Sequence, residues 1–268
     1  MSILKMHIPA LLPLAASSFV NPPSQHLFSN PSVETDIKIP TPYESAVMAR
    51  RILNLTPLAT ISTVFPSPNL PSSDPEDLDE RLSSVNSIPI GLTEYIGDCE
   101  DSGNPTILGL SIATYMKNAA AGSNISLSLQ YTPPYPPASR IKSVLPSKKD
   151  PRDVGYSAAN LPRFALLGYL EKISEAETSA TQLEQCFLKL HPDAKYWLPG
   201  NDIHESKWVR LVVRDIYWVG GFGDRAYIGW IPVEEWENVT REEWEKIKLP
   251  GEQKGWKEWT VDKFSLGA

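Results

Sequence analysis

The pattern of residues 191–230 sets the tightest limit on how this chain can fold. Residues 207–219, KWVRLVVRDIYWV, are rich in β-branched and aromatic side chains, which favour a long strand. Three glycines follow within 220–223, where the backbone can turn sharply or approach another group closely. A strand pattern then resumes at 226–231. We therefore predict a β-hairpin with a glycine-rich turn, because a glycine cluster alone is weak evidence for a ligand beside it.

Strand patterns recur along the rest of the chain, with helical patterns between them. Strands are predicted at 58–64, 88–96, 105–110, 125–130 and 163–173, and helices at 42–54, 111–121, 175–190 and from residue 240 onward. Segments 88–96 and 105–110 are expected to form a hairpin around the turn at 101–104. Several strands follow one another without a crossover helix, so parallel winding is disfavoured. The pattern predicts an α+β fold, in which about six strands form a closed or partly open barrel capped by helices.

Two of the predicted helices carry clear start signals. Thr41 with Glu44, and Thr240 with Glu243, have the spacing of a capping box. In the segment 175–190, the apolar residues at 183, 186, 187 and 190 form one stripe, which is more typical of a core-facing side than of a cofactor site.

The composition excludes several classes of protein. The 268 residues are 41% hydrophobic, which fits a folded core, and their net charge of −7 argues against a general nucleic-acid binder, which needs a basic face. No apolar run approaches the ~20 residues of a membrane-spanning helix. Cys99 and Cys186 fit either one disulfide or two buried thiols. Residues 131–162 form a long proline-rich loop, and such loops are usually functional or disordered.

The two ends of the chain have distinct compositions. Residues 1–20 have the layout of a secretory signal, with Lys5, an apolar stretch at 8–16 and small residues after it. Residues 21–40 are interpreted as an extended lead-in. Tryptophans in the tail 237–268, including Trp256 and Trp259, indicate that the tail packs back onto the domain.

Three sequons, at Asn54, Asn124 and Asn238, are potential glycosylation sites. Pro57 makes the first a poor acceptor. Together with the leader, these sequons predict a secretory glycoprotein modified at Asn124 and Asn238. A cytoplasmic protein with a disordered leader is the alternative.

Motifs of the common enzyme classes are absent from the sequence. There is no nucleophile elbow, phosphate-binding Walker loop or dinucleotide fingerprint, and no Cys/His spacing matches a zinc site. His191 and His204 are interpreted as structural, and Asp224 with Arg225 as a local ion pair. No catalytic residue is assigned and no metal site is predicted.

One group of residues has the chemistry of an anion site. Ser111, Thr114 and Lys117 recur at i, i+3 and i+6 of the predicted helix 111–121, whose N-terminus suits a phosphate. On spacing alone, an ordinary exposed face is favoured. Arg50 and Arg51 fall in the last predicted turn of helix 42–54, where they either complement the helix dipole or reach an anionic ligand.

Several segments resemble one protein superfamily in the right order along the chain. These are ESAVMARRILN, LATIST, ILGLSIATYMKNAAAGSNISLSLQ, RFALLGYLEKIS, FLKLHPDAKYW and VGGFGDRAYIGW. They resemble the FMN-binding split-barrel superfamily that includes pyridoxamine 5′-phosphate oxidases, and most closely its CREG-type branch. The resemblance implies a six-stranded antiparallel split barrel over residues 41–236 and a homodimer.

The resemblance also carries expectations for a cofactor. A flavin would lie in the dimer groove, with its phosphate held by Ser111, Thr114 and Lys117, helped by Arg50 or Arg51. The sequence departs from flavin-binding members because strand 105–110 has no basic residue, and Tyr115 stands where many haem-binding relatives have histidine. CREG-type proteins lack the flavin, and a loop fills their groove; here the loop 131–162 is the candidate.

Two functional hypotheses follow. In the first, the protein is a secreted or vacuolar CREG-like glycoprotein without catalytic activity, which acts by binding a partner or ligand. In the second, it is an FMN-dependent oxidoreductase, in which the flavin supplies the redox chemistry. Haem binding is a third, more distant reading.

Overall fold

The fold was analysed in a computed structural model, which describes residues 39–66, 85–136, 158–223 and 226–255. All of these belong to one compact unit, residues 36–268. The strands in the described ranges are β1 Leu58–Val64, β2 Pro89–Tyr95, β3 Thr106–Leu110, β4 Ile125–Gln130, β5 Arg163–Lys172, β6 Ser206–Val219 and β7 Ile228–Ile231. The helices are α1 Pro42–Leu55, α3 Thr114–Ala120, α4 Glu175–Ala180, α5 Leu183–Leu190, α6 Val233–Asn238 and α7 Arg241–Lys246, with 3₁₀ turns η3 Ala158–Asn160 and η4 Pro192–Trp197.

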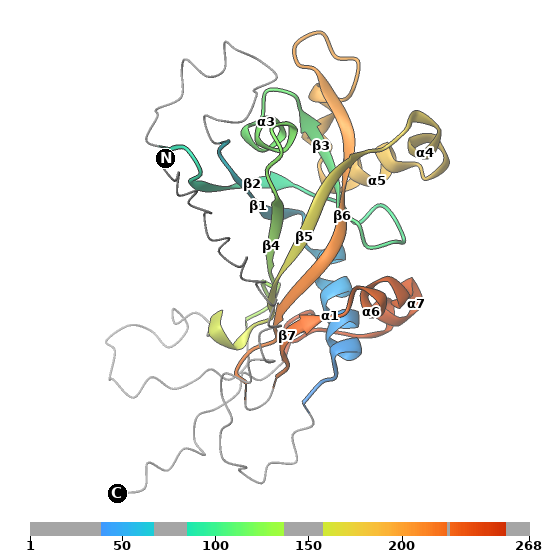
Figure 1. The fold of residues 1–268 in the computed structure, drawn as a ribbon. Helices are drawn as coiled ribbons and strands as arrows, with labels where there is room; N and C mark the ends of the chain where they lie inside the picture. Colours follow the sequence, from blue (N-terminus) through green and yellow to red (C-terminus); the bar gives the residue numbers. More distant parts are fainter. Residues whose placement is uncertain (1–38, 67–84, 137–157, 224–225, 256–268) are drawn as a thin grey trace, which may run out of the picture. The chain divides into compact units, whose positions relative to one another are not determined.

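The strands form one antiparallel sheet in the order β2-β1-β4-β5-β6-β3, and β7 pairs with the end of β6 (Figure 1). The first and last strands of this path are linked by a single bridge, between Gly97 and Thr106. The sheet therefore curls into a barrel that stays split between β2 and β3. The predicted α+β antiparallel split barrel is confirmed, and so is the hairpin with the glycine turn at 220–223.

The hairpin predicted between 88–96 and 105–110 is wrong. β2 pairs with β1, and β3 pairs with β6, so the two segments share only the bridge at their base. The intervening residues instead contact α1 through the carbonyl of Asp101 and α5 through the disulfide of Cys99. A short turn between two strand patterns does not by itself decide which strands pair.

The main core lies inside the barrel. Inward-facing residues of the strands, such as Ile61, Leu127, Leu166 and Trp218, are buried against one face of α1. α1 starts with the predicted capping box of Thr41 and Glu44. Figure 1 shows α1, α6 and α7 grouped at the end of the sheet away from α3.

The C-terminal segment contributes to the same core. Val239, Trp244 and Leu249 are buried in it, and α7 begins with the predicted capping box of Thr240 and Glu243. The tail tryptophans Trp256 and Trp259 lie outside the described residues.

A second, smaller core lies on the outer side of β3 and β6. There α5 and η4 pack against β3 and β6, and the buried residues include Leu108 and Trp208 of the strands and Leu183 and Phe187 of α5. Cys99 and Cys186 form a disulfide that ties the segment after β2 to α5. This settles the alternative that the sequence left open in favour of one disulfide.

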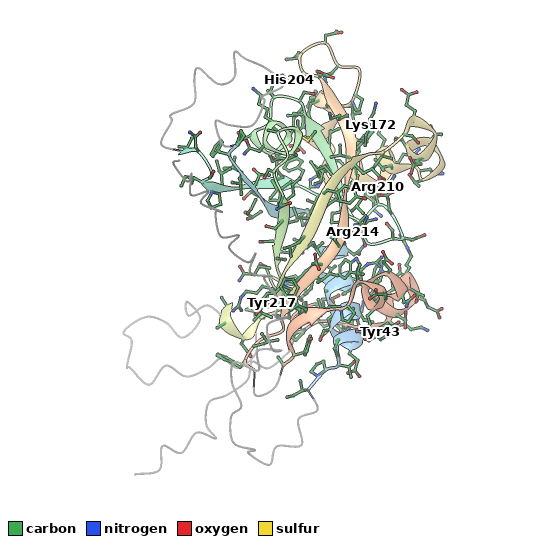
Figure 2. The ribbon with its side chains drawn as sticks, in the orientation of Figure 1. Tyr43, Lys172, His204, Arg210, Arg214 and Tyr217 are labelled. Atoms are coloured by element: carbon green, nitrogen blue, oxygen red, sulfur yellow. A yellow bond between two sulfur atoms is a disulfide. The ribbon has the colours of Figure 1, made fainter. Side chains whose placement is uncertain are left out.

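The acidic residues around this core converge on one arginine. Arg210 of β6 forms ion pairs with Glu100, Glu171 and Glu177, which come from three different segments. Figure 2 shows Arg210 on β6, on the side facing α4 and α5. The ion pair between Arg210 and Glu177 links α4 to β6.

The helix predicted over 175–190 is interrupted. α4 ends at Ala180, and Gln182 adopts a left-handed conformation with φ 50° before α5 begins. The break turns α5 so that Leu183 and Phe187 enter the second core, whereas Leu190 stays partly exposed. The apolar stripe was correctly assigned to the core, but its helix is shorter than predicted.

A buried arginine joins α1 to two other segments. The guanidinium of Arg50 donates to the carbonyl oxygens of Trp236 and Val239, each at 3.3 Å, and of Asp101 at 2.7 Å. It also lies over the Trp236 ring, 5.3 Å from its centre. α1 runs on to Leu55, so Arg50 and Arg51 precede its last turn rather than forming it.

The carboxyl group of Asp98 lies in the same buried region. Burial raises its pKa to about 6, although the neighbouring Arg50 acts in the opposite direction. The Asn54 side chain hydrogen-bonds to it, but its Oδ1 atom has no hydrogen-bond partner among the described residues. The charged form of Asp98 is therefore poorly accommodated in the folded protein.

β5 and β6 lose register between Leu167 and Gly168, where Arg214 is the extra residue of a β-bulge. A Cβ atom on Gly168 would overlap the carbonyl oxygen of Val212. Gly168 is thus required by the close approach of the two strands at the bulge.

Gly168→Ala should lower the free energy of unfolding by about 3 kcal/mol, because the strands must move to admit the methyl group. Gly223→Ala is the matched control: its Cβ meets nothing closer than the Ile228 side chain at 3.5 Å. The control should change the free energy of unfolding by no more than about 0.5 kcal/mol. Urea denaturation measures both, and equal losses would contradict the role given to the bulge.

Asp98→Asn should change how stability depends on pH. The folded-state pKa of about 6 lies above the ordinary value of 3.8, so the folded protein binds the extra proton between these values. The free energy of unfolding should then fall as the pH rises from about 4 to about 6, by up to about 3 kcal/mol, and this contribution should vanish in the variant. Denaturation at a series of pH values tests it, with Asp202→Asn controlling for the loss of one negative charge. Parallel profiles for Asp98→Asn and wild type would refute it.

Candidate functional site

The residues predicted to bind a phosphate, Ser111, Thr114 and Lys117, do not all lie on α3. α3 begins at Thr114 with Ala113 as its N-cap and no side-chain capping bond, so Ser111 precedes the helix. The backbone N–H of Ser111 donates to the carbonyl of Glu205 at 2.9 Å. The face proposed for Ser111, Thr114 and Lys117 at i, i+3 and i+6 is therefore not a single helical face.

The buried side of α3 serves the barrel. Tyr115, Met116 and Asn118 are buried, and the Asn118 side chain donates to the Thr63 hydroxyl of β1 at 2.9 Å. Met116 lies against Gly109 of β3, where a Cβ would come within 2.9 Å of its sulfur. α3 thus closes the barrel between β3 and β1.

The sequence resemblance placed Tyr115 where many haem-binding relatives have histidine. It is 4% exposed, and burial is the main cause that raises the pKa of its phenol, with Glu94 adding to the effect. A neutral phenol held inside the barrel is poorly placed to ligate a metal from outside.

Arg51 lies elsewhere, on α1, in a two-point ion pair with Glu252. The two hydrogen bonds measure 3.1 and 2.5 Å, and the two side chains are 11% and 8% exposed. Glu252 also accepts the N–H of Leu249 at 2.8 Å. Arg51 therefore anchors the C-terminal segment to α1, and Figure 1 shows α1 and α3 at different ends of the sheet.

The histidines are placed as follows. His191 is buried, its Nε2 lies 2.9 Å from the carbonyl oxygen of Ile96, and its ring stacks on Tyr95 at 4.2 Å. It is structural, as predicted. His204 is exposed in a turn whose N–H groups are bound by Asn201. The Asp224–Arg225 pair lies outside the described residues.

A groove of about 320 Å³ lies on the outer face of the sheet instead. It crosses β1, β4, β5 and β6, and its lining residues are Thr60, Ser128, Leu129, Gln130, Arg163, Phe164, Ala165, Tyr217 and Val219. Figure 2 shows Tyr217 on the side of the sheet away from Tyr43 of α1. Sequence reasoning missed this groove, although the alternation along 125–130 identifies its outward-facing positions on β4, Ser128 and Gln130.

Several side chains that line the groove can form hydrogen bonds. Among the described residues, the side chains of Thr60, Ser128, Gln130 and Arg163 make no hydrogen bond or ion pair. Next to the groove, Trp230 is 56% exposed and its ring packs edge-on against Tyr217 at 5.1 Å. Such a surface can bind a ligand or another protein.

Neither a membrane-spanning helix nor a metal-binding cluster is found among the described residues. They contain no helix both long and apolar enough to cross a bilayer. They also contain no cluster of three or more His, Cys, Asp or Glu side chains able to hold a metal ion.

Solved structures of low sequence identity share parts of this architecture. A heme binding protein from Mycobacterium smegmatis is 19% identical, with a TM-score of 0.46, covering 75% of this chain and 62% of that one. The protein Atu2129 from Agrobacterium tumefaciens is 19% identical, with a TM-score of 0.42, covering 78% and 64%. The chain thus spans less than two thirds of the length of these two proteins. A FAD and Heme binding protein from Mycobacterium smegmatis is 15% identical, with a TM-score of 0.37, covering 76% and 78%.

A search of curated proteins gave no match. The family model described as "CREG, beta-barrel" matches residues 40–238, which is most of the chain and the whole of the sheet. The chain belongs to the CREG beta-barrel family.

Proposed function

We propose that this protein is a CREG-type glycoprotein of the secretory route, without catalytic activity, that acts as a homodimer by binding a partner or ligand. The observation that carries this proposal is the Arg51–Glu252 ion pair. This pair engages Arg51, one of the two arginines expected to help bind a flavin phosphate, and holds it to the C-terminal segment.

The residues present do not fit an FMN phosphate. Ser111 lies outside α3, and β3, which precedes it, contains no basic residue. Releasing Arg51 to a phosphate would leave the largely buried Glu252 with Lys248, 3.9 Å away, as its remaining cationic partner among the described residues, and would remove two hydrogen bonds to a buried carboxylate, which is unfavourable. Two of the neighbouring structures are of heme- or FAD-binding proteins, but that resemblance is too distant to transfer a ligand.

Two features support the secretory route. The Cys99–Cys186 disulfide is of a kind that persists in oxidising compartments and is rare in the cytosol. Asn124 precedes β4 and Asn238 ends α6, and both side chains are exposed. By contrast, Asn54 is partly buried and bonded to Asp98.

The first test of this function is the visible absorbance spectrum of the purified full chain, as isolated and after incubation with FMN followed by dialysis. A colourless protein that retains no flavin is the expected result, and Lys117→Ala should behave as wild type. A stable flavin spectrum that is lost in Lys117→Ala would overturn the proposal and establish the oxidoreductase alternative. Lys246→Ala, on exposed α7, is the matched control for loss of a lysine.

The second test is the glycan content after expression in a eukaryotic secretory host. Asn124→Gln and Asn238→Gln should each remove one enzymatically releasable glycan, seen as a mass difference by intact mass spectrometry. Asn54→Gln should leave the glycan mass unchanged, since its sequon is followed by Pro57. A secreted wild-type protein without glycan would contradict the assignment of both asparagines.

A further inference from the structure

One long edge of β2 has no partner strand among the described residues. β2 and β3 are the two ends of the sheet path, and they share only the bridge between Gly97 and Thr106. β2 pairs with β1 along its whole length, so its other edge borders the split of the barrel (Figure 1). We call this unpaired side of β2 the free edge. An unpaired strand edge presents a row of main-chain N–H and C=O groups that another strand can bind.

The hydrogen bonds at the two ends of the β1–β2 ladder show which groups face the free edge. Ile96 donates its N–H to the carbonyl of Pro57 at 3.0 Å, and Phe65 donates to the carbonyl of Ile88 at 3.1 Å. Both pairs fit one antiparallel register, in which hydrogen-bonded pairs alternate with pairs that direct their main-chain groups away from each other. The groups of residues 88, 90, 92, 94 and 96 therefore face β1, and those of residues 89, 91, 93 and 95 face the free edge.

Two residues of the free edge have both main-chain groups open. Pro89 has no N–H, and the backbone of Tyr95 hydrogen-bonds to the Glu94 side chain. Gly91 and Thr93 are exposed, and neither forms a main-chain hydrogen bond across the free edge with another described residue. A strand laid antiparallel against them can form two hydrogen-bonded pairs, one at each residue.

The opposite side of the split also carries unpaired main-chain groups. Leu211 donates its N–H to the carbonyl of Pro105 at 2.9 Å, so Thr106 and Leu108 of β3 direct their groups away from β6. Thr106 uses both of its groups in the bridge to Gly97. Leu108 is 6% exposed, and its N–H and C=O bind no other described residue, although buried main-chain groups are normally paired. Beyond the bridge, both edges of the split therefore lack a described strand partner.

The usual protections of an edge strand are confined to one end of β2. Pro89 is its first residue. Just before it the pairing is irregular, because Ser87, with a φ of 60°, and Ile88 both bond to Phe65. Prolines and bulges are devices by which natural proteins block the addition of a strand at an edge. The free edge has neither device from Gly91 onward.

The side chains on the inner side of β2 indicate the chemistry of a partner. Leu92 stands opposite Ile61 in the register and shares its side of the sheet. Ile61 is 1% exposed, whereas Leu92 is 49% exposed and has no described strand beyond it. Ile90 and Glu94 lie on the same side, because every second residue of a strand faces the same way. Two apolar side chains and one carboxylate therefore line the inner side of the free edge.

Glu94 gives this side of the free edge a negative group. Burial raises the pKa of its carboxyl group, and the hydrogen bond from the backbone of Tyr95 acts in the opposite direction. Glu94 forms no ion pair with a lysine, arginine or histidine of the described ranges. Opposite charges attract more strongly at a partly buried position than in water, so a basic side chain suits this position.

We propose that the free edge binds an extended segment of another protein, which adds to the sheet as an antiparallel strand. The segment reads basic-x-apolar-x-apolar, where x is any residue. Its basic side chain lies opposite Glu94, and its apolar side chains lie opposite Leu92 and Ile90. The two x residues pair with Thr93 and Gly91 through the main chain. This inference rests on the proposed function, in which the chain acts by binding a partner, and it names the chemistry of that partner.

Strand addition divides the work between the main chain and the side chains. The main-chain hydrogen bonds supply affinity for any extended segment, and the alternate side chains select among segments. The apolar side chains of the segment would cover the exposed surface of Leu92, and its basic group would neutralise Glu94. The register, rather than one deep pocket, thus determines which segment binds.

The first test is fluorescence anisotropy of the full chain with a labelled synthetic peptide, acetyl-SKTVTVS-amide. We expect a dissociation constant of about 100 µM or tighter. Thr93→Pro should weaken binding by at least about tenfold, because proline removes the N–H that faces the free edge and leaves the pairing with β1 in place. Thr93→Val is the matched control, which keeps the N–H and should bind within about twofold of wild type.

The second test exchanges the charges. Glu94→Lys should weaken binding of the same peptide by at least about tenfold, because it places two lysines opposite one another. The peptide acetyl-SETVTVS-amide should bind this variant to within about threefold of the original pair, since the opposite charges are restored with reversed sign. Glu237→Lys, an exposed residue of α6, is the matched control and should bind both peptides as wild type does.

Two results would overturn the inference. One is the absence of binding at peptide concentrations up to about 1 mM. The other is equal affinity of Thr93→Pro and Thr93→Val, which would place the peptide elsewhere. Urea denaturation of each variant separates loss of the free edge from loss of fold, and the charge exchange keeps the inference testable if Thr93→Pro does not fold.

The absorbance experiment distinguishes this inference from the proposed function. A colourless chain that binds no peptide removes the inference but leaves the non-catalytic function standing. A chain that retains flavin and also binds the peptide at the free edge removes that function and leaves the strand-addition site in place.

Discussion

The buried guanidinium of Arg50 is the contact on which the arrangement of the structure depends. A buried charge is costly unless it is well paired, and here carbonyl oxygens from α6, from the residue after it and from the turn at 101–104 all accept from one side chain. Three segments distant in sequence must be in place together for the charge to be satisfied. The turn can approach because Gly103 has a φ of 76° and no side chain, and a Cβ there would lie 2.6 Å from Arg50. The N-terminal helix, the C-terminal helices and the split edge of the barrel are thereby joined.

This use of arginine bears directly on function. Arg50 is bound to backbone carbonyls, Arg51 to Glu252, and Arg210 to three glutamates. Each of these cations stabilises a junction between elements, so none is available to an anionic cofactor without loss of a structural contact. All three arginines are therefore held in contacts within the split barrel. A fold constrains where a site can lie, but the site residues decide what it binds.

Much of the fold could be predicted from local patterns. The capping boxes at Thr41 and Thr240, the alternation in β4 and the glycine turn after β6 all depend on neighbouring residues, and all were placed correctly. What failed depends on distant contacts. The pairing of β3 with β6 rather than β2, and the break at Gln182 that turns α5 into the second core, are set by partners far along the chain. The structural role of Arg51 could not be inferred, because Glu252 lies about 200 residues away in a segment with no pattern linking it to α1.

The outer surface of β4, β6 and β7 carries exposed rings beside small polar side chains. An antiparallel sheet with one wet face normally alternates apolar residues inward with polar residues outward, and β4 follows this rule with Ser126, Ser128 and Gln130. β6 and β7 break it: Tyr217, Trp230 and Ile228 point outward and remain exposed. Exposed rings beside small polar side chains are expected where a second surface completes the burial. The outer surface of β6 and β7 therefore departs from the pattern of a fully solvated sheet face.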